Sequence, residues 1–166
     1  MQCLQGTLVL PEETYVANGS PGGGSGGHLE FSALNLTTTG SGNLFLQANG
    51  VGGGNGGTTI LQVLNPSFNL VTGSGVGQLR MSATGGSAGS VTGDGGVVTV
   101  QVGGNLTVNP SHLLADPLGE SGRGAWFSLG AGVGGQGILL VSGNINASGK
   151  GAGSGGRISL RHLCSH

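Results

Sequence analysis

The sequence predicts an all-β fold, a right-handed parallel β-helix (solenoid) of about four three-stranded coils with glycine-rich loops. The first observation behind this prediction is an internal repeat, in which an asparagine followed by a branched aliphatic residue recurs every 34 to 39 residues. The second is that short apolar runs flank each such pair, and glycine pairs separate the units. One coil of this kind cannot bury its own apolar side, so the repeats are stable only when they stack. The four pairs are Asn35-Leu36, Asn69-Leu70, Asn105-Leu106 and Asn144-Ile145.

The repeats are expected to form one domain, residues 1–166. Each repeat should contain three strands, a, b and c, which in the first repeat lie at about 28–33, 35–39 and 43–48. Residues 110–124 match none of the three strands and are interpreted as a loop insertion in the third repeat. Parallel crossover connections favour a right-handed winding. The predicted repeats are residues 26–55, 56–94, 95–134 and 135–162.

Alternation along the c strands predicts the residues of the core. Later c strands, expected at about 78–83, 125–130 and 157–162, would stack on the first at the ~4.8 Å spacing of paired strands. An antiparallel sandwich is the competing architecture, but a sandwich has no reason to reuse one coil pattern. The predicted inward residues are Leu44, Leu46, Ala48, Leu79, Met81, Ala83, Phe127, Leu129, Ala131, Ile158 and Leu160.

Composition narrows the classes of function. Glycine supplies 40 of the 166 residues, but without the strict third-residue register of collagen. The net charge is −1 and the five Lys and Arg residues are scattered, which argues against a nucleic-acid partner. No apolar stretch approaches the ~20 residues of a membrane span. No signal peptide is visible at the N-terminus.

Stacked coils are expected to place the four asparagines of the repeat above one another. Identical amides at the strand spacing can hydrogen-bond along such a column, as asparagine ladders do in cross-β stacks. The alternative is that they are turn residues that tolerate a left-handed backbone. The predicted structural column consists of Asn35, Asn69, Asn105 and Asn144.

One repeated pattern resembles a known group of proteins. Glycine pairs, an alternating apolar run, Asn-Leu, Gly-Ser-Gly and Leu-x-Leu-x-Ala follow one another in residues 26–48 and again in 56–83. This order resembles right-handed parallel β-helix proteins, and among them the glycine-rich solenoid repeats of filamentous-haemagglutinin-type and autotransporter-type surface proteins. The resemblance covers most of the chain. It implies a secreted or surface-exposed stalk or adhesin, and it names no ligand.

The densest polar cluster of this charge-poor chain lies in the predicted insertion and its flank. A loop on a rigid solenoid is a reasonable place for a ligand-contact site, although an ordinary surface loop is the simpler interpretation. His112 and Asp116 alone make a weak metal site, since zinc takes three or four ligands. We therefore expect no metal, cofactor or catalytic residue. The candidate contact residues are His112, Asp116, Glu120, Arg123 and Trp126.

The ends of the chain suggest how copies could join. The solenoid is expected to begin and end on c-type strands, at 7–10 and 157–161. The end faces of the stack would therefore both offer strand edges with unpaired backbone groups. Heterologous stacking of such faces gives filaments. Cys3 and Cys164 are expected to link neighbouring subunits or to remain free. Asn18, in a loop, is the one comfortable glycosylation acceptor.

These observations predict a noncatalytic structural or adhesive module, extracellular or at the cell surface, whose partners are other copies of itself or flanking solenoid repeats. One alternative is a carbohydrate-active β-helix enzyme or a fragment of one, with Asp116 or Glu120 as the working carboxylate. Another is a glycan-binding module that uses Trp126 and Phe45 as stacking surfaces.

Overall fold

The computed structural model describes residues 2–86, 93–133 and 135–162, and it consists of short β-strands joined by glycine-rich segments. Two 3-10 turns, η1 (Val76–Gln78) and η2 (Pro110–His112), are the helical elements of the described chain. The strands are β1 (Gln2–Pro11), β2 (Thr14–Val16), β3 (His28–Thr39), β4 (Phe45–Gln47), β5 (Thr58–Val63), β6 (Leu70–Val71), β7 (Arg80–Ser82), β8 (Val97–Val102), β9 (Leu106–Val108), β10 (Leu113–Leu114), β11 (Trp126–Ala131), β12 (Leu139–Val141) and β13 (Arg157–His162).

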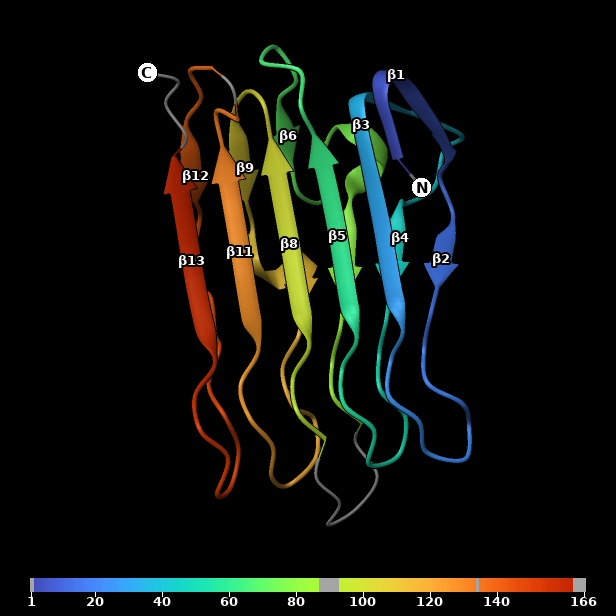
Figure 1. The fold of residues 1–166 in the computed structure, drawn as a ribbon, viewed down its shortest axis with the longest axis vertical. Coiled ribbons are helices and arrows are strands. Elements are labelled where there is room, and N and C mark those ends of the chain that lie inside the picture. The colour runs from blue at the N-terminus through green and yellow to red at the C-terminus, as the bar shows by residue number, and fades with distance from the viewer. Residues whose placement is uncertain (1, 87–92, 134, 163–166) are drawn as a thin grey trace.

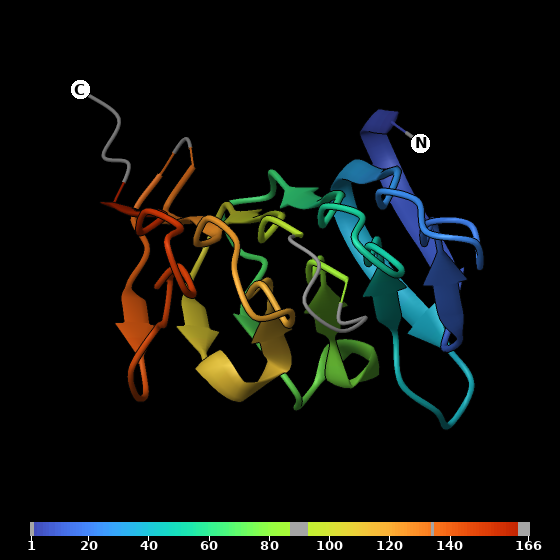
Figure 2. The ribbon, with the colours of Figure 1, turned by 90° about the horizontal axis from the view of Figure 1, so that it is seen from below.

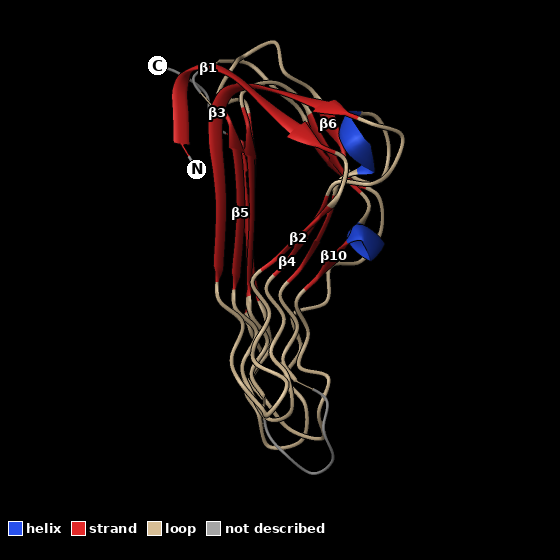
Figure 3. Ribbon diagram, turned by 90° about the vertical axis from the view of Figure 1, so that its right-hand side faces the viewer, coloured by secondary structure: helices blue, strands red, loops and turns tan. Residues whose placement is uncertain are grey.

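These strands form three parallel sheets that wind around one core. Sheet A has the order β1-β3-β5-β8-β11-β13, sheet B has β2-β4-β7-β10, and sheet C has β6-β9-β12. In Figure 1, the strands of sheet A run upward side by side, from β1 on the right to β13 on the left. Seen along the stack, the chain rises through sheet A, crosses the top and descends through sheet B (Figure 3). Because successive turns follow one another along the stack in chain order, the winding is right-handed (Figures 1 and 3). The predicted parallel solenoid is confirmed, with about five turns and not about four.

The core is a set of columns of alternate residues, one residue from each turn. In sheet A, the pairing of β3, β5, β8, β11 and β13 stacks two such columns at the spacing of paired strands. The side chains between the first and last turns are buried, as the alternation along the strands predicts. Burying a large aliphatic side chain contributes about 1.5–3 kcal/mol, so stacking stabilises coils that could not fold singly. The columns are Leu29-Thr59-Val98-Phe127-Ile158 and Phe31-Leu61-Val100-Leu129-Leu160.

The predicted insertion at 110–124 is wrong. Leu113 pairs with Met81 in sheet B, so β10 is the c strand of the third turn, and residues after it form an ordinary return loop. Trp126 pairs with Val97, which makes β11 the a strand of a new turn. The third repeat thus ends near residue 124 and not near 134. Because β10 has only two residues, it shows no alternation of apolar and polar residues by which the sequence could reveal it.

The same shift changes the last predicted repeat. β12 pairs with β9 and is a b strand, whereas the predicted repeat 135–162 would begin here with an a strand. β13 pairs with β11 and is an a strand, not a c strand. Consequently Phe127, Leu129 and Ala131 belong to a different column from Met81, although they are buried as predicted.

β3 bends from one wall of the solenoid to the next. Its first half, 28–33, pairs with β5, and its second half, 35–39, pairs with residues 7–11 of β1. Figure 3 shows β1 and β3 turning together over the top of the coil. The segment 7–10 is therefore a b-type strand and not the c-type strand that the sequence suggested.

Below the sheets, glycine-rich segments of successive turns form two packed layers, which Figure 2 shows from below. Backbone hydrogen bonds join the layers, such as Gly57 N–H to the Ala48 carbonyl at 2.7 Å and Gly96 N–H to the Ala83 carbonyl at 2.9 Å. Others join turns, such as Gly56 N–H to the Asp94 carbonyl at 2.8 Å. A methyl group on Gly57 would overlap backbone atoms of the neighbouring turn. Glycine is needed here because backbones touch directly.

None of the described residues forms a helix with the length and apolar character needed to cross a membrane.

Candidate functional site

One corner of the coil carries a column of asparagines. The side-chain oxygen of Asn69 accepts the backbone N–H of Asn105 at 2.8 Å, and the oxygen of Asn105 accepts the backbone N–H of Ile138 at 2.8 Å. Both asparagines are exposed. The column therefore exists, but its amides face outward and bond to backbone groups of the next turn. It is not the inward amide-to-amide ladder that the repeat suggested.

Asn35 is bonded to a different asparagine from the one predicted. Its side-chain oxygen accepts a short hydrogen bond from the side-chain amide of Asn65. The second turn carries extra residues between β5 and β6, so its corner has two asparagines, Asn65 and Asn69. Asn35 bonds with the first of them and the column begins at the second.

Asn144 lies outside the column altogether. Leu139 of β12 pairs with Leu106 of β9, so the residue that follows Asn105 in the column is Ile138. Asn144 comes after β12 and lies beside sheet B instead. The column position of this turn holds Ile138 and not an asparagine. The asparagine-aliphatic pattern therefore matched Asn144 instead.

A second column was missed. In the return loops, the side-chain oxygen of Ser25 accepts the Asn55 N–H at 3.1 Å, that of Asn55 accepts the Asp94 N–H at 2.9 Å, and that of Asp94 accepts the Arg123 N–H at 2.7 Å. A polar residue followed by two glycines precedes four of the a strands, at Ser25, Asn55, Asp94 and Ser154. That motif is a signal that could have revealed the column.

A third column includes the predicted glycosylation acceptor. The side-chain oxygen of Asn18 accepts the Asn49 N–H at 2.7 Å, and the oxygen of Asn49 accepts the Thr84 N–H at 3.0 Å. Asn18 itself is exposed, and its amide nitrogen lies 3.5 Å from the side-chain oxygen of Gln47. Its accessibility suits a glycan acceptor, while its oxygen has a structural role.

The predicted contact cluster does not converge on one site. His112, in η2, places its ring Nδ1 3.0 Å from the Thr72 carbonyl oxygen of the preceding turn. Glu120 and Arg123 are exposed in the return loop. Trp126 is 45% exposed on the outer face of sheet A, where the guanidinium of Arg157 lies 5.2 Å from its ring centre. Of the five residues, Asp116 borders the groove described below.

Trp126 and Phe45 do not form a shared stacking surface. Trp126 belongs to β11 in sheet A, and Phe45 belongs to β4 in sheet B. The two aromatic residues therefore lie on different walls of the solenoid.

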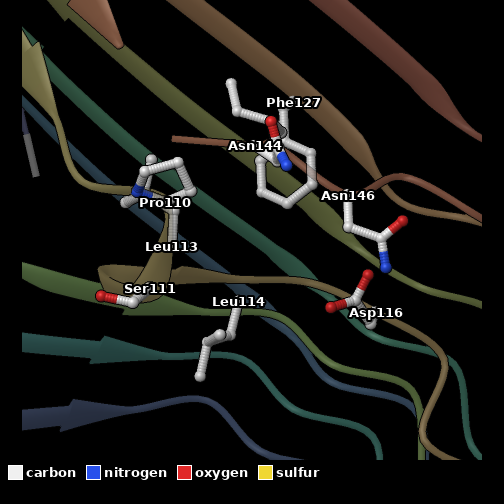
Figure 4. A pocket seen from close by; sticks show the side chains of 9 residues that line it. Pro110, Ser111, Leu113, Leu114, Asp116, Phe127, Asn144 and Asn146 are labelled. Atoms are coloured by element: carbon white, nitrogen blue, oxygen red, sulfur yellow. The ribbon is translucent and has the colours of Figure 1, made fainter. Parts of the chain in front are cut away.

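The cavity beside Asp116 is a groove of about 280 Å³ between η2, β10 and the segment 144–146. It forms because sheet B stops at β10, so the third segment of the fourth turn does not pair with it. Leu113 and Phe127 lie along its floor, and the side chains of Asn144 and Asn146 line its other side (Figure 4).

Asp116 is the electrostatically unusual residue of this groove. Its Oδ1 is buried and has no hydrogen-bond partner among the described residues. Burial raises the pKa of its carboxyl, and the charge of Lys150 opposes that rise. A carboxyl with a raised pKa can serve as a proton donor, but it can equally be an imperfectly satisfied structural group.

The described residues hold no cluster of three or more His, Cys, Asp or Glu side chains that could bind a metal. Cys3 lies in β1, opposite Ala33, and Cys164 falls outside the described residues. The predicted link between the two cysteines therefore stays a prediction.

The C-terminal face of the solenoid is open. β13 is the last strand of sheet A, and no described strand pairs with its far edge. Its inward residues Ile158 and Leu160 are 42% and 52% exposed, although Leu129, one turn earlier in the same column, is fully buried. With Val141 and Ile145 they surround a shallow apolar hollow.

Comparisons of the chain with models of protein families, with curated proteins and with solved structures found no match.

Proposed function

We propose that this chain is a noncatalytic structural or adhesive solenoid module, of the extracellular stalk kind, whose C-terminal face receives a further coil. Another copy or flanking solenoid repeats would supply that coil. The single observation that carries the proposal is the exposure of Ile158 and Leu160 at positions where the turns between the first and the last are buried. In a stacked fold, such a face is completed by another coil or a cap.

The strand registers define an experiment. His162 occupies the same position in its turn as Ala131, Val102, Val63 and Ala33. Joining residues 34–162 of a second copy directly after His162 therefore continues the winding in register. We expect this tandem chain to unfold in urea as one cooperative unit with a larger m-value than the single chain, because m grows with the surface exposed on unfolding.

The matched control is a tandem in which a flexible Gly-Ser linker separates the two copies. Stacking should be lost or weakened there, and the chain should unfold like the single copy. If the direct fusion and the linked fusion unfold identically, with the m-value of one copy, the C-terminal face does not accept a coil and the proposal is wrong.

A second candidate is a glycan-binding or carbohydrate-active groove beside β10. The raised pKa of Asp116, its unpartnered oxygen and the amides of Asn144 and Asn146 favour it. Amides, a carboxyl and apolar side chains are groups that contact sugars in binding sites. Hydrolase, lyase and binding assays on acidic and neutral polysaccharides test it. Turnover that disappears in Asp116→Asn, but not in Glu120→Gln, would replace the structural proposal with this one.

A further inference from the structure

We infer that the partner of the open C-terminal face is the N-terminal face of a second copy of this chain, selected by opposite charge. This inference rests on the proposed function and names the partner. The charges of the chain are sorted along the solenoid axis: no Lys or Arg precedes Arg80, and no Asp or Glu follows Glu120. Because the turns stack in chain order, this asymmetry in sequence is an asymmetry in space (Figure 1).

The N-terminal face is acidic. Glu12 and Glu13 occupy the turn between β1 and β2, the first strands of sheets A and B. Glu30 lies on β3 in the part that β1 leaves unpaired, since the pairing of β1 with β3 begins at Ser32. Three carboxylates therefore lie before β5, in a part of the chain that holds no Lys or Arg. Of these carboxylates, Glu30 lies 3.3 Å from the ring Nε2 of His28.

The C-terminal face is basic. Arg157 and Arg161 are exposed on β13, and Lys150 is exposed in the loop that leads to it. Arg161 Nε donates to Ser159 Oγ at 3.2 Å within β13, and the guanidinium of Arg157 lies 5.2 Å from the ring centre of Trp126. The last turn contains no Asp or Glu side chain, and Lys150 is close enough to Asp116 of the preceding turn to act on its pKa.

Apolar groups lie on both faces as well. At the C-terminal face they are Ile158 and Leu160. At the N-terminal face, Tyr15 packs edge-on against Phe31, with ring centres 5.3 Å apart, and is only partly covered. Apolar contact supplies attraction, whereas opposite charge excludes head-to-head and tail-to-tail pairs.

The strand direction agrees with the charge. All strands of sheet A run the same way, so a second copy stacked head to tail places its strands parallel to β13. Stacking of two different faces is heterologous, and successive additions extend a filament.

The test uses charge reversal in the full chain, with sedimentation velocity as the readout of self-association. Arg157→Glu with Arg161→Glu makes both faces acidic, and Glu13→Lys with Glu30→Lys makes both faces basic. We expect each double variant to associate at least tenfold more weakly than the unaltered chain. An equimolar mixture should regain head-to-tail association. The altered acidic C-terminal face of the first variant then meets the altered basic N-terminal face of the second, and the two unaltered faces likewise carry opposite charge. Arg80→Glu, a charge reversal in a middle turn, should leave association unchanged.

Thermal unfolding of each variant checks that the fold persists. If the double variants associate as strongly as the unaltered chain, charge does not select the partner and the inference is overturned. If the unaltered chain stays monomeric at all concentrations while the direct tandem still unfolds as one unit, the second copy is not the partner, but the proposed function stands. If the direct tandem also does not unfold as one unit, both the proposed function and this inference are wrong.

Discussion

The side-chain oxygen of Asn69 accepts the backbone N–H of Asn105, one turn further along the chain, at 2.8 Å. Asn105 repeats the contact with Ile138, so each asparagine caps a backbone donor at the corner where a new strand begins. The corner of a coil leaves such donors unpaired unless a side chain reaches them. These exposed amides therefore join turns together without belonging to the core.

Replacing Asn105 by alanine should lower the free energy of unfolding by about 0.5–1.5 kcal/mol, the usual net contribution of one hydrogen bond. Asn105→Asp keeps the acceptor oxygen, so it should lower the free energy of unfolding by less than Asn105→Ala does. Asn144→Ala is the matched control, because no hydrogen bond joins its side chain to the described residues, and it should stay within about 0.5 kcal/mol. Urea denaturation measures all three. Equal losses at Asn105 and Asn144 would show that the column does not stabilise the stack.

Glycine at position 57 should be essential because a neighbouring backbone fills the space beside it. A Cβ there would overlap the Gly27 carbonyl oxygen, and a backbone atom cannot rotate away. Gly57→Ala should therefore cost about 3 kcal/mol or more, at the upper end of the range for overpacking. Thermal or urea unfolding provides the measurement.

Gly155 is the control for that substitution. A Cβ at Gly155 would meet no atom within 4 Å. Gly155→Ala should be neutral, or stabilising by up to about 1 kcal/mol through the unfolded chain. A comparable loss at both glycines would mean that close backbone packing is not what the glycines provide.

The assignment of β10 to the core can be tested with adjacent leucines. Leu113 is 5% exposed and faces the core, whereas Leu114 is 44% exposed and faces outward. Leu113→Ala should cost about 2–3 kcal/mol, at the low end of the range for buried leucine because a groove adjoins it. Leu114→Ala should cost less than about 1 kcal/mol. Small losses at both positions would restore the interpretation of 110–124 as an inserted loop.

Much of the fold could be read from the repeat, and the reason is physical. Alternating apolar residues at a fixed period can be buried only by stacking, and the first two turns, with strands such as β4 and β5, follow the predicted order. The assignment failed where strands become very short. β10 has two residues, and the segment 144–147 is not a strand. The runs that became β11, β12 and β13 were therefore each assigned one strand position too early.

The candidate site was harder to predict. Of the five residues in the predicted contact cluster, only Asp116 borders the groove. Trp126 lies on sheet A, and the ring of His112 contacts the Thr72 carbonyl of the preceding turn although η2 borders the groove. The sequence predicts an unpaired strand edge at the C-terminal end of the solenoid, but it does not predict the exposure of Ile158 and Leu160 there. Ile158 and Leu160 look like ordinary core residues, and their exposure depends on which turn they occupy.

Asp116 should make stability depend on pH in a definite direction. Burial raises the pKa of its carboxyl, so the folded chain holds this proton more tightly than the unfolded chain does. The resulting stability is present below the pKa of the unfolded state and is lost as pH rises through the folded pKa. Asp116→Asn removes the charged form. The variant should therefore be more stable than the unaltered chain near pH 7, by a margin that shrinks toward about pH 3.5.

Urea denaturation at several pH values measures that margin, with Glu120→Gln, an exposed residue of the same loop, as the control. A difference between Asp116→Asn and the unaltered chain that does not change with pH would show that burial of the charge is not its cause.

The most direct test of coil stacking is the cost of Leu160→Lys in two settings. In the single chain, Leu160 is 52% exposed, and lysine there should cost less than about 1 kcal/mol. In the tandem joined directly after His162, the added turn should bury this position, and an uncompensated lysine should cost about 3 kcal/mol or more. Ser159→Lys, on the outward side of β13, should cost equally little in both chains. Equal costs for Leu160→Lys in the two chains would contradict the stacking account.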